Sequence, residues 1–156
     1  MMEIPVPGKG PIILHHLVAD FNGTLATDGK LLPGVMDRLD ALADDLAIHI
    51  VTADTHGTVA ETFSGTSHKV VIIPADNQDQ AKLDYIRDLG PDRVAAVGNG
   101  RNDLLMLREA SLSIAVVGAE GAFVDALGGA QIASASITDA LDLLLHPLRL
   151  TATLRV

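Results

Sequence analysis

Short apolar runs alternate along this chain with segments in which apolar residues recur at helical spacing. Runs of strand length lie at 12–19, 47–51, 69–73, 94–97, 113–117 and 131–133. Apolar residues spaced three and four apart indicate helices at 33–46, 58–63, 78–89, 104–109, 123–127 and 137–145. This alternation predicts an α/β fold, a doubly wound parallel sheet with helices on both faces.

Some segments are less regular than the rest. The first predicted strand contains His15 and His16, which a strand would point to opposite faces, so a shared metal ion is not expected. Residues 26–32 are polar and contain glycine, which indicates a loop. Residues 147–156 are expected to be extended or to dock on a neighbouring molecule.

Composition supports the same fold. Hydrophobic residues make up 48% of the chain but aromatic residues only 3%, so the core must be aliphatic, as in a parallel sheet covered on both faces. At 156 residues, the simplest organisation is a single domain spanning residues 1–156.

The net charge of the chain and the length of its apolar runs indicate which classes of partner are not expected. Asp and Glu number 20 against 11 Lys and Arg, a net charge of −9, so nucleic acid is not expected as a partner. The chain contains no cysteine, which excludes disulfides and thiolate metal sites. No apolar run approaches the ~20 residues of a membrane span, and no signal-peptide core opens the sequence. We therefore expect no membrane partner and a cytoplasmic location.

Polar groups follow three of the predicted strands. Asp20 ends the first, Thr52 and Asp54 end the second, and the loop 98–103, with sequence Gly-Asn-Gly-Arg-Asn-Asp, follows the fourth. Carboxyl ends of parallel strands meet at one edge of a sheet, where ligands bind. A carboxylate there can be a nucleophile or hold a hard cation, and Lys82 could add a positive charge. Glycines 23, 98 and 100 would let backbone N–H groups approach an anion. The set suits phosphoryl transfer with magnesium.

Each of these residues also has a structural interpretation. An aspartate before Asn-Gly, such as Asp20, can simply end a strand at a turn. Thr52 and Asp54 can cap the helix that follows them. Lys82 can be an ordinary solvated residue on a helix face.

Taken in order, the motifs resemble those of the haloacid dehalogenase (HAD) superfamily, and within it the phosphorylation domain of P-type ATPases. The family motif Asp-x-Asp/Thr-Gly-Thr-Leu is matched by 20–25, Asp-Phe-Asn-Gly-Thr-Leu. Thr52-Ala53-Asp54 is similar to the ATPase Thr-Gly-Asp, Lys82 takes the place of the motif lysine, and 98–103 is similar to Gly-Asp-Gly-x-Asn-Asp. Segments 113–116 and 128–133 also resemble the ATPase domain.

The resemblance implies a HAD-like Rossmannoid core and a Mg²⁺-dependent phosphohydrolase, a phosphatase that acts through an aspartyl phosphate on Asp20. It implies a small phosphorylated substrate, or phosphate, as the ligand. The implied catalytic residues are Asp20, Asn22, Thr52 and Lys82. The implied phosphate-binding residues are Gly23, Thr52, Ala53, Lys82 and Asn102. The implied Mg²⁺ ligands are Asp20, the backbone carbonyl of Asn22, Asn99 and Asp103.

Two residues depart from the family pattern. Asn22 stands where the phosphatases of the family carry an acid–base aspartate, and such help is worth ~10²–10⁴-fold in rate, so turnover is expected to be slow. Asn99 stands where an acidic metal ligand is usual, so weaker metal binding is expected. Both features favour the alternative of a catalytically degenerate HAD-fold module that binds phosphate or a partner protein.

Large insertions known in the family are absent. Residues 26–51 leave no room for an ATP-binding domain, and none remains for a cap domain between Thr55 and Gln80, so we expect a capless core and not a transport ATPase. Because such a site would lie open to water, we expect a homo-oligomer in which a neighbouring subunit covers it. The apolar tail residues Leu148, Leu150 and Leu154 are the candidate contact.

Overall fold

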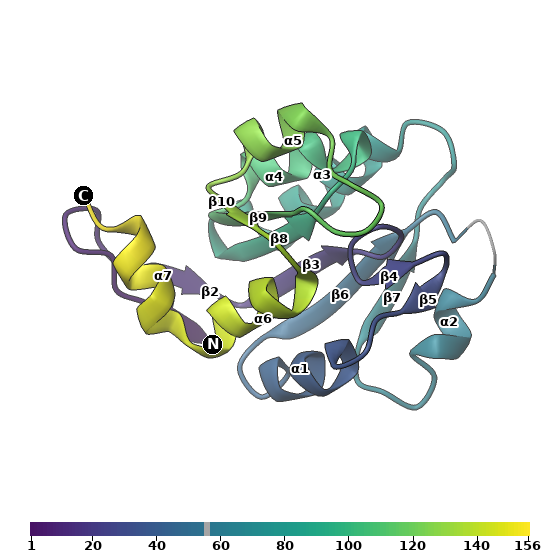
Figure 1. Cartoon of the computed structure of the whole chain (residues 1–156), viewed down its shortest axis with the longest axis horizontal. Helices are drawn as coiled ribbons and strands as arrows, with labels where there is room; N and C mark the ends of the chain where they lie inside the picture. Colours follow the sequence, from purple (N-terminus) through teal and green to yellow (C-terminus); the bar gives the residue numbers. More distant parts are fainter. Residues whose placement is uncertain (55–56) are drawn as a thin grey trace.

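A parallel sheet forms the centre of the molecule (Figure 1). The computed structural model describes residues 1–54 and 57–156. Thr55, the first residue of the segment predicted to be too short for a cap domain, lies outside the described residues. Within these ranges, six strands pair in parallel in the order β10-β9-β8-β3-β6-β7. Their bounds are β3 (His16–Asp20), β6 (Ala47–Thr52), β7 (Lys69–Ile72), β8 (Val94–Gly98), β9 (Leu112–Val116) and β10 (Ile132–Ser134). The predicted doubly wound α/β fold is confirmed.

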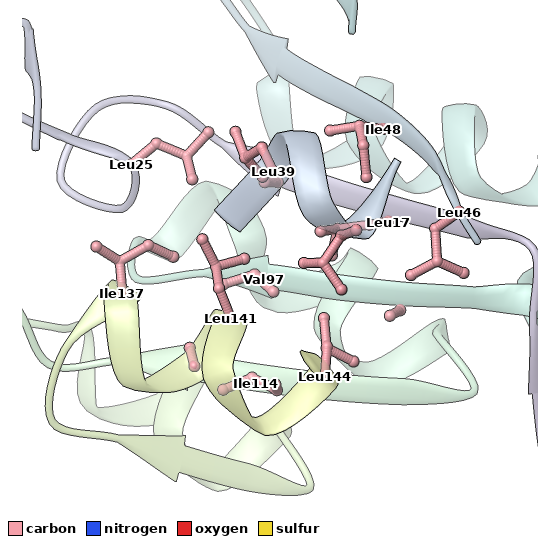
Figure 2. Packing of buried hydrophobic residues seen from close by; sticks show 14 of the residues in the cluster. Leu17, Leu25, Leu39, Leu46, Ile48, Val97, Ile114, Ile137, Leu141 and Leu144 are labelled. Atoms are coloured by element: carbon pink, nitrogen blue, oxygen red, sulfur yellow. The ribbon is translucent and has the colours of Figure 1, made fainter. Parts of the chain in front are cut away.

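Helices cover both faces of this sheet (Figure 1). One face carries α1 (Val35–Leu42) and α6 (Ile137–Leu145), and the other carries α3 (Gln78–Leu89), α4 (Leu104–Glu109) and α5 (Val124–Gly129). Successive strand residues divide between the two layers, because side chains alternate across a strand. Leu17 and Ala19 pack in the layer under α1 and α6, whereas Val18 packs under the other helices. Figure 2 shows part of the first layer, which is mostly aliphatic, as the composition predicts, and contains Phe21 and Phe63 as its aromatic members.

The first predicted strand is wrong in its extent. It breaks at His15 into β2 (Ile12–Leu14), which pairs antiparallel with β1 (Met2–Ile4), and β3 of the main sheet. His15 lies between them, its N–H donating to the carbonyl of Arg93 and its own carbonyl accepting from Ala47. The chain therefore changes partner strand at one residue. His16 lies against His49, with 3.1 Å between His16 Nδ1 and His49 Nε2.

The carboxyl-terminal segment is not extended. Residues Pro147–Leu154 form α7, with proline in the first turn, where its missing N–H costs no helical hydrogen bond. Leu150 is fully buried and Leu154 is half-buried against the same core, while Leu148 is exposed. The predicted intermolecular contact through all three leucines is therefore wrong for Leu150, because this side chain is used within its own chain.

The predicted loop 26–32 contains a small hairpin of β4 (Ala26–Thr27) and β5 (Lys30–Leu31). Its turn residues, Asp28 and Gly29, have φ of 50° and 72°. Positive φ at both positions is what a tight two-residue hairpin turn requires, and Asp-Gly meets that requirement well. The hairpin lies near the carboxyl end of β3 (Figure 1).

The short helix α2 (Val59–Thr62) follows β6 on the other side of the undescribed pair of residues. Among the described helices, none has the length and apolar character needed to span a bilayer.

Candidate active site

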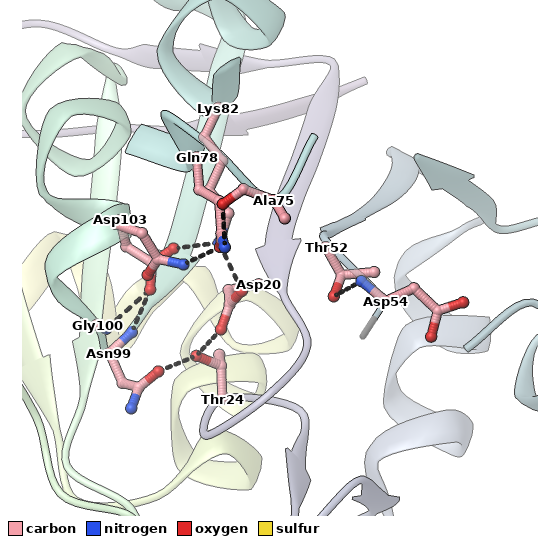
Figure 3. A network of polar contacts seen from close by, with 11 residues as sticks. Asp20, Thr24, Thr52, Asp54, Ala75, Gln78, Lys82, Asn99, Gly100 and Asp103 are labelled. Atoms are coloured by element: carbon pink, nitrogen blue, oxygen red, sulfur yellow. Dashed lines mark hydrogen bonds and ion pairs between the residues drawn. The ribbon is translucent and has the colours of Figure 1, made fainter. Parts of the chain in front are cut away.

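Three segments that are distant in sequence bring charged side chains together at the carboxyl edge of the sheet. Asp20 ends the central strand β3, Lys82 projects from the second turn of α3, and Asp103 ends the 3₁₀ turn Arg101–Asp103 after β8. Lys82 Nζ lies 2.5 Å from Asp20 Oδ1 and 2.7 Å from Asp103 Oδ1 (Figure 3). All three side chains are buried, so the ion pairs are shielded from solvent. The structure thus joins the residues that the first, third and fourth motifs predict.

Asp103 is fixed on its second oxygen by the backbone. Its Oδ2 accepts from the N–H groups of Asn99, at 3.0 Å, and Gly100, at 2.8 Å. A Cβ on Gly98 would lie 2.5 Å from Asp103 Cγ, so this close approach requires glycine. The sequence predicts that Gly98 lets backbone N–H groups approach an anion. In the structure, Gly98 makes room for the carboxylate of Asp103.

Thr24 is a site residue that the sequence reasoning missed. Its buried Oγ1 lies 3.2 Å from Asp20 Oδ2 and 3.0 Å from Asn99 Oδ1, within hydrogen-bond distance of both (Figure 3). The hydroxyl therefore links the carboxylate of β3 to the loop after β8. The available signal was its place in the first motif, four residues after Asp20.

Burial and charge set the protonation of this cluster. Burial, together with the neighbouring Asp103 carboxylate, raises the pKa of Asp20 to about 7, against the opposing effect of Lys82 and Thr24. Burial alone would lower the pKa of Lys82, but Asp20 and Asp103 outweigh it and raise that pKa to about 12. Lys82 therefore stays charged, and one lysine is shared by two carboxylates.

The second motif lies at the same edge but outside this network. Thr52 is buried at the end of β6, next to β3, and its Oγ1 accepts from the N–H of Asp54 at 3.1 Å (Figure 3). Asp54 Oδ1 accepts from the N–H groups of Thr58, at 3.1 Å, and Val59, at 3.3 Å. The structure therefore supports the capping interpretation of Asp54. Ala53 lies half-buried between these two residues.

The remaining predicted residues occupy the rim. Asn102 Nδ2 donates to Gln78 Oε1 at 2.8 Å, and Gln78, a residue that the sequence reasoning did not single out, donates in turn to the carbonyl of Ala75. Asn22 is half-buried in the turn after Asp20. Gly23 has φ of 79°, and its N–H donates to the carbonyl of Ala26 at 2.8 Å, so glycine closes this turn without strain.

The donor set at this edge fits a hard divalent cation. With Lys82 charged, ionised Asp20 and Asp103 leave one uncompensated negative charge in a buried place. Asp20 Oδ2 and Asn99 Oδ1 lie within reach of the same Thr24 hydroxyl. Carboxylate, amide and backbone carbonyl oxygens are ligands that Mg²⁺ accepts. The described residues contain no group of three or more His, Asp or Glu side chains placed to hold a metal, and the side chain at position 99 is a neutral amide.

Two hollows flank the cluster. One of about 480 Å³ is lined by Gln78 and Asn102 with Ala75, Asn77, Asp79 and Arg101. The other, of about 320 Å³, borders Gly23 and Thr24 and reaches the start of α6. Both lie at the carboxyl edge of the sheet, one bordered by Asn102 beside Asp103 and the other by Thr24, which contacts Asp20, but Asp20 itself lines neither.

Known structures share this architecture. A proposed HAD family hydrolase from Streptomyces avermitilis aligns with a TM-score of 0.69 at 24% identity, over 86% of this chain and 87% of that chain. The cobalt-bound deoxy-D-mannose-octulosonate 8-phosphate phosphatase of Haemophilus influenzae aligns with a TM-score of 0.68 at 17% identity, over 89% and 91%. The corresponding phosphatase of Moraxella catarrhalis, in complex with magnesium, phosphate and its sugar, gives 0.67 at 18%, over 89% and 90%. At these identities the likeness shows the fold.

Sequence comparison finds two relatives in Methanocaldococcus jannaschii. The uncharacterized protein MJ0073 is 43% identical over 79 residues, which are 48% of this chain and 85% of that protein. The uncharacterized protein MJ0072 is 49% identical over 39 residues, which are 25% of this chain and 89% of that protein. No family model matches the chain. The chain therefore has the fold of the HAD hydrolases and belongs to the same family as MJ0073.

Proposed function

We propose that this chain is a Mg²⁺-dependent phosphohydrolase of the HAD type that acts on a small phosphorylated substrate through a phosphorylated Asp20. The observation that carries the proposal is the buried triad in which Lys82 bridges Asp20 and Asp103 at the ligand-binding edge of the sheet. A structural ion pair would not need a second carboxylate, and burying two carboxylates with one lysine is costly. That cost is understandable if the site is built to receive a cation.

In the proposed reaction, a carboxylate oxygen of Asp20 attacks phosphorus, the Asp20–phosphate bond forms, and the bond to the leaving alcohol breaks. Water then attacks the phosphorus and releases phosphate and the free carboxylate. Bound Mg²⁺ would neutralise charge on the phosphoryl oxygens. Asp20, the backbone carbonyl of Asn22, Asn99 and Asp103 would hold it.

The chain's own groups have separate parts in this scheme. Lys82, which stays charged, orients Asp20 and offers an ammonium group to the phosphoryl group. Thr52, Ala53, Gly23 and Asn102 would contribute donors around it. Asn22 can move no proton, so the leaving oxygen and the attacking water exchange protons with solvent, and the second step is slow.

The test is a screen of small phosphomonoesters with Mg²⁺, with phosphate release compared between the wild type and Asp20→Asn. Mg²⁺-dependent release that this substitution abolishes is the expected result. Release that survives the substitution would overturn the proposal.

The second candidate is a HAD-fold module that binds phosphate or a partner protein without turnover, and Asn22 and Asn99 are the residues that favour it. Phosphate binding that is measurable by calorimetry, combined with no release from any phosphomonoester, would support this alternative.

We also propose that residues 1–156 act as a single capless domain that assembles into homo-oligomers. The carboxyl edge is bordered by two open hollows, and closing a site against water strengthens its electrostatics. Exposed Leu148, on α7, remains a candidate contact. Sedimentation of a monomer alone at working concentrations would contradict the assembly.

A further inference from the structure

The site lacks a negative charge where the family pattern supplies one. Asn99 offers an amide oxygen to a cation, and this oxygen already lies 3.0 Å from the Thr24 hydroxyl. Mg²⁺ in proteins is usually held by one or two carboxylates and keeps several of its waters. A nearby carboxylate that is not a direct ligand can therefore still bind through those waters.

Glu120 is the carboxylate that the fold brings to this place. It lies in a four-residue turn after β9, closed by the N–H of Gly121 donating to the carbonyl of Gly118 at 2.9 Å. Asn99 holds the end of that turn and the segment just after it. Its Nδ2 donates to the carbonyl of Gly121 at 3.0 Å, and its own carbonyl accepts from the N–H of Phe123 at 2.8 Å.

The two oxygens of Glu120 have different surroundings. Oε1 accepts from the N–H of Asp28 at 2.8 Å, which ties the turn to the β4–β5 hairpin. Oε2 faces Gly23, where an added Cβ would meet Glu120 Oε2 at 3.0 Å, Asn99 Nδ2 at 2.6 Å and Asn99 Oδ1 at 3.0 Å. Because all three atoms surround one point, Glu120 Oε2 and Asn99 Oδ1 are at most about 6 Å apart, a span that a hydrated Mg²⁺ with Mg–O distances of about 2 Å can bridge.

We infer that Glu120 is a positioning residue of the cation site, which supplies through water the negative charge that Asn99 lacks. This inference rests on the proposed function, because it concerns the same Mg²⁺. If Glu120 served only to close the hairpin, Oε1 alone would satisfy the N–H of Asp28. The second oxygen instead converges with Asn99 over a glycine that leaves space for both side chains.

The test measures Mg²⁺ affinity by calorimetry, without substrate, for the wild type and Glu120→Gln. Glutamine keeps an acceptor oxygen for the N–H of Asp28 but removes the charge. Loss of a residue that orients a metal's ligands typically weakens binding 10–100-fold, and we expect about tenfold weaker Mg²⁺ binding here. Glu3→Gln, an exposed residue of β1, is the matched control and should leave the affinity unchanged.

A second measurement separates charge from structure. Binding of inorganic phosphate without Mg²⁺ should be unchanged or tighter in Glu120→Gln, because a nearby negative charge is gone. Loss of both Mg²⁺ and phosphate binding would indicate a distorted site and overturn the assignment. Equal Mg²⁺ affinity in the wild type and Glu120→Gln would overturn this inference alone. A wild type that does not bind Mg²⁺ would overturn the proposed function together with it.

Discussion

Replacing Asp20 with asparagine should stabilise the metal-free protein. The pKa of Asp20 is raised from 3.8 to about 7, first by burial and then by Asp103. Since a tenfold change in proton affinity corresponds to about 1.4 kcal/mol, keeping Asp20 ionised in the fold costs up to about 4 kcal/mol above pH 7. Asparagine has nearly the same shape and avoids this cost. Allowing for relaxation of Lys82 toward Asp103, we expect a gain of about 2–4 kcal/mol at pH 8.

The gain should depend on pH in a defined way. Below pH 3.8 Asp20 is protonated in both the folded and the unfolded chain, so the substitution changes little. Between pH 3.8 and about 7 the folded state holds a proton that the unfolded state has released, so wild-type stability falls as pH rises. The advantage of Asp20→Asn should therefore grow across this window and then level off.

Urea unfolding with chelator present, from pH 4 to pH 8, measures this difference. Burial lowers the pKa of His49 to about 4. The stability of the folded protein that depends on neutral His49 is therefore lost as pH falls below 6.5, the opposite direction to the effect of Asp20. Comparing the two proteins at each pH cancels that contribution. Asp44→Asn, at an exposed aspartate after α1, is the control and should change the unfolding free energy by less than about 0.5 kcal/mol. A constant difference, or destabilisation by Asp20→Asn at pH 8, would refute the reasoning.

Three further substitutions test other contacts. Lys82→Met leaves two buried carboxylates facing each other and should cost about 3–5 kcal/mol of unfolding free energy in urea at pH 8 without metal; a loss below about 1 kcal/mol would contradict this. Asn22→Asp restores an acid–base group and should raise turnover toward ~10²-fold, at saturating Mg²⁺ only, in a phosphate-release assay; no gain at any Mg²⁺ concentration would mean that Asn22 does not limit the rate. Gly23→Ala places a methyl group 2.6 Å from Asn99 Nδ2 at a φ of 79° and should lower the melting temperature and weaken Mg²⁺ binding together; an unchanged Mg²⁺ affinity would argue against the close packing over Gly23.

Much of the fold was predictable because, in the long elements, the spacing of the apolar residues agrees with the positions of the residues that end helices and strands. The predicted helices 78–89, 104–109 and 137–145 match α3, α4 and α6 at both ends. The prediction failed where segments are short. In β1 and β2 three residues per strand are too few to show an alternating pattern. In α7, Thr151 and Thr153 are poor helix formers, and packing of Leu150 against the core decides the conformation instead.

The site was predictable in its charged residues and less so in its connections. Motif order indicated that Asp20, Lys82 and Asp103 meet, because strands of a parallel sheet end at one edge. Glu120 could not be predicted in this way. Its contact with Asp28 joins residues 92 positions apart through two loops, and loop conformation follows from turn geometry and not from hydrophobic period.

The proposed function depends above all on the transfer of a phosphoryl group to Asp20. Incubation with a reactive phosphate donor and Mg²⁺, followed by acid quench and mass spectrometry of peptides, measures this most directly. We predict that the peptide containing Asp20 gains the mass of one phosphoryl group in the wild type and that the gain is absent from Asp20→Asn. Mg²⁺-dependent phosphate release with the phosphoryl group on a different residue, or with no phosphorylated peptide and full activity in Asp20→Asn, would contradict it.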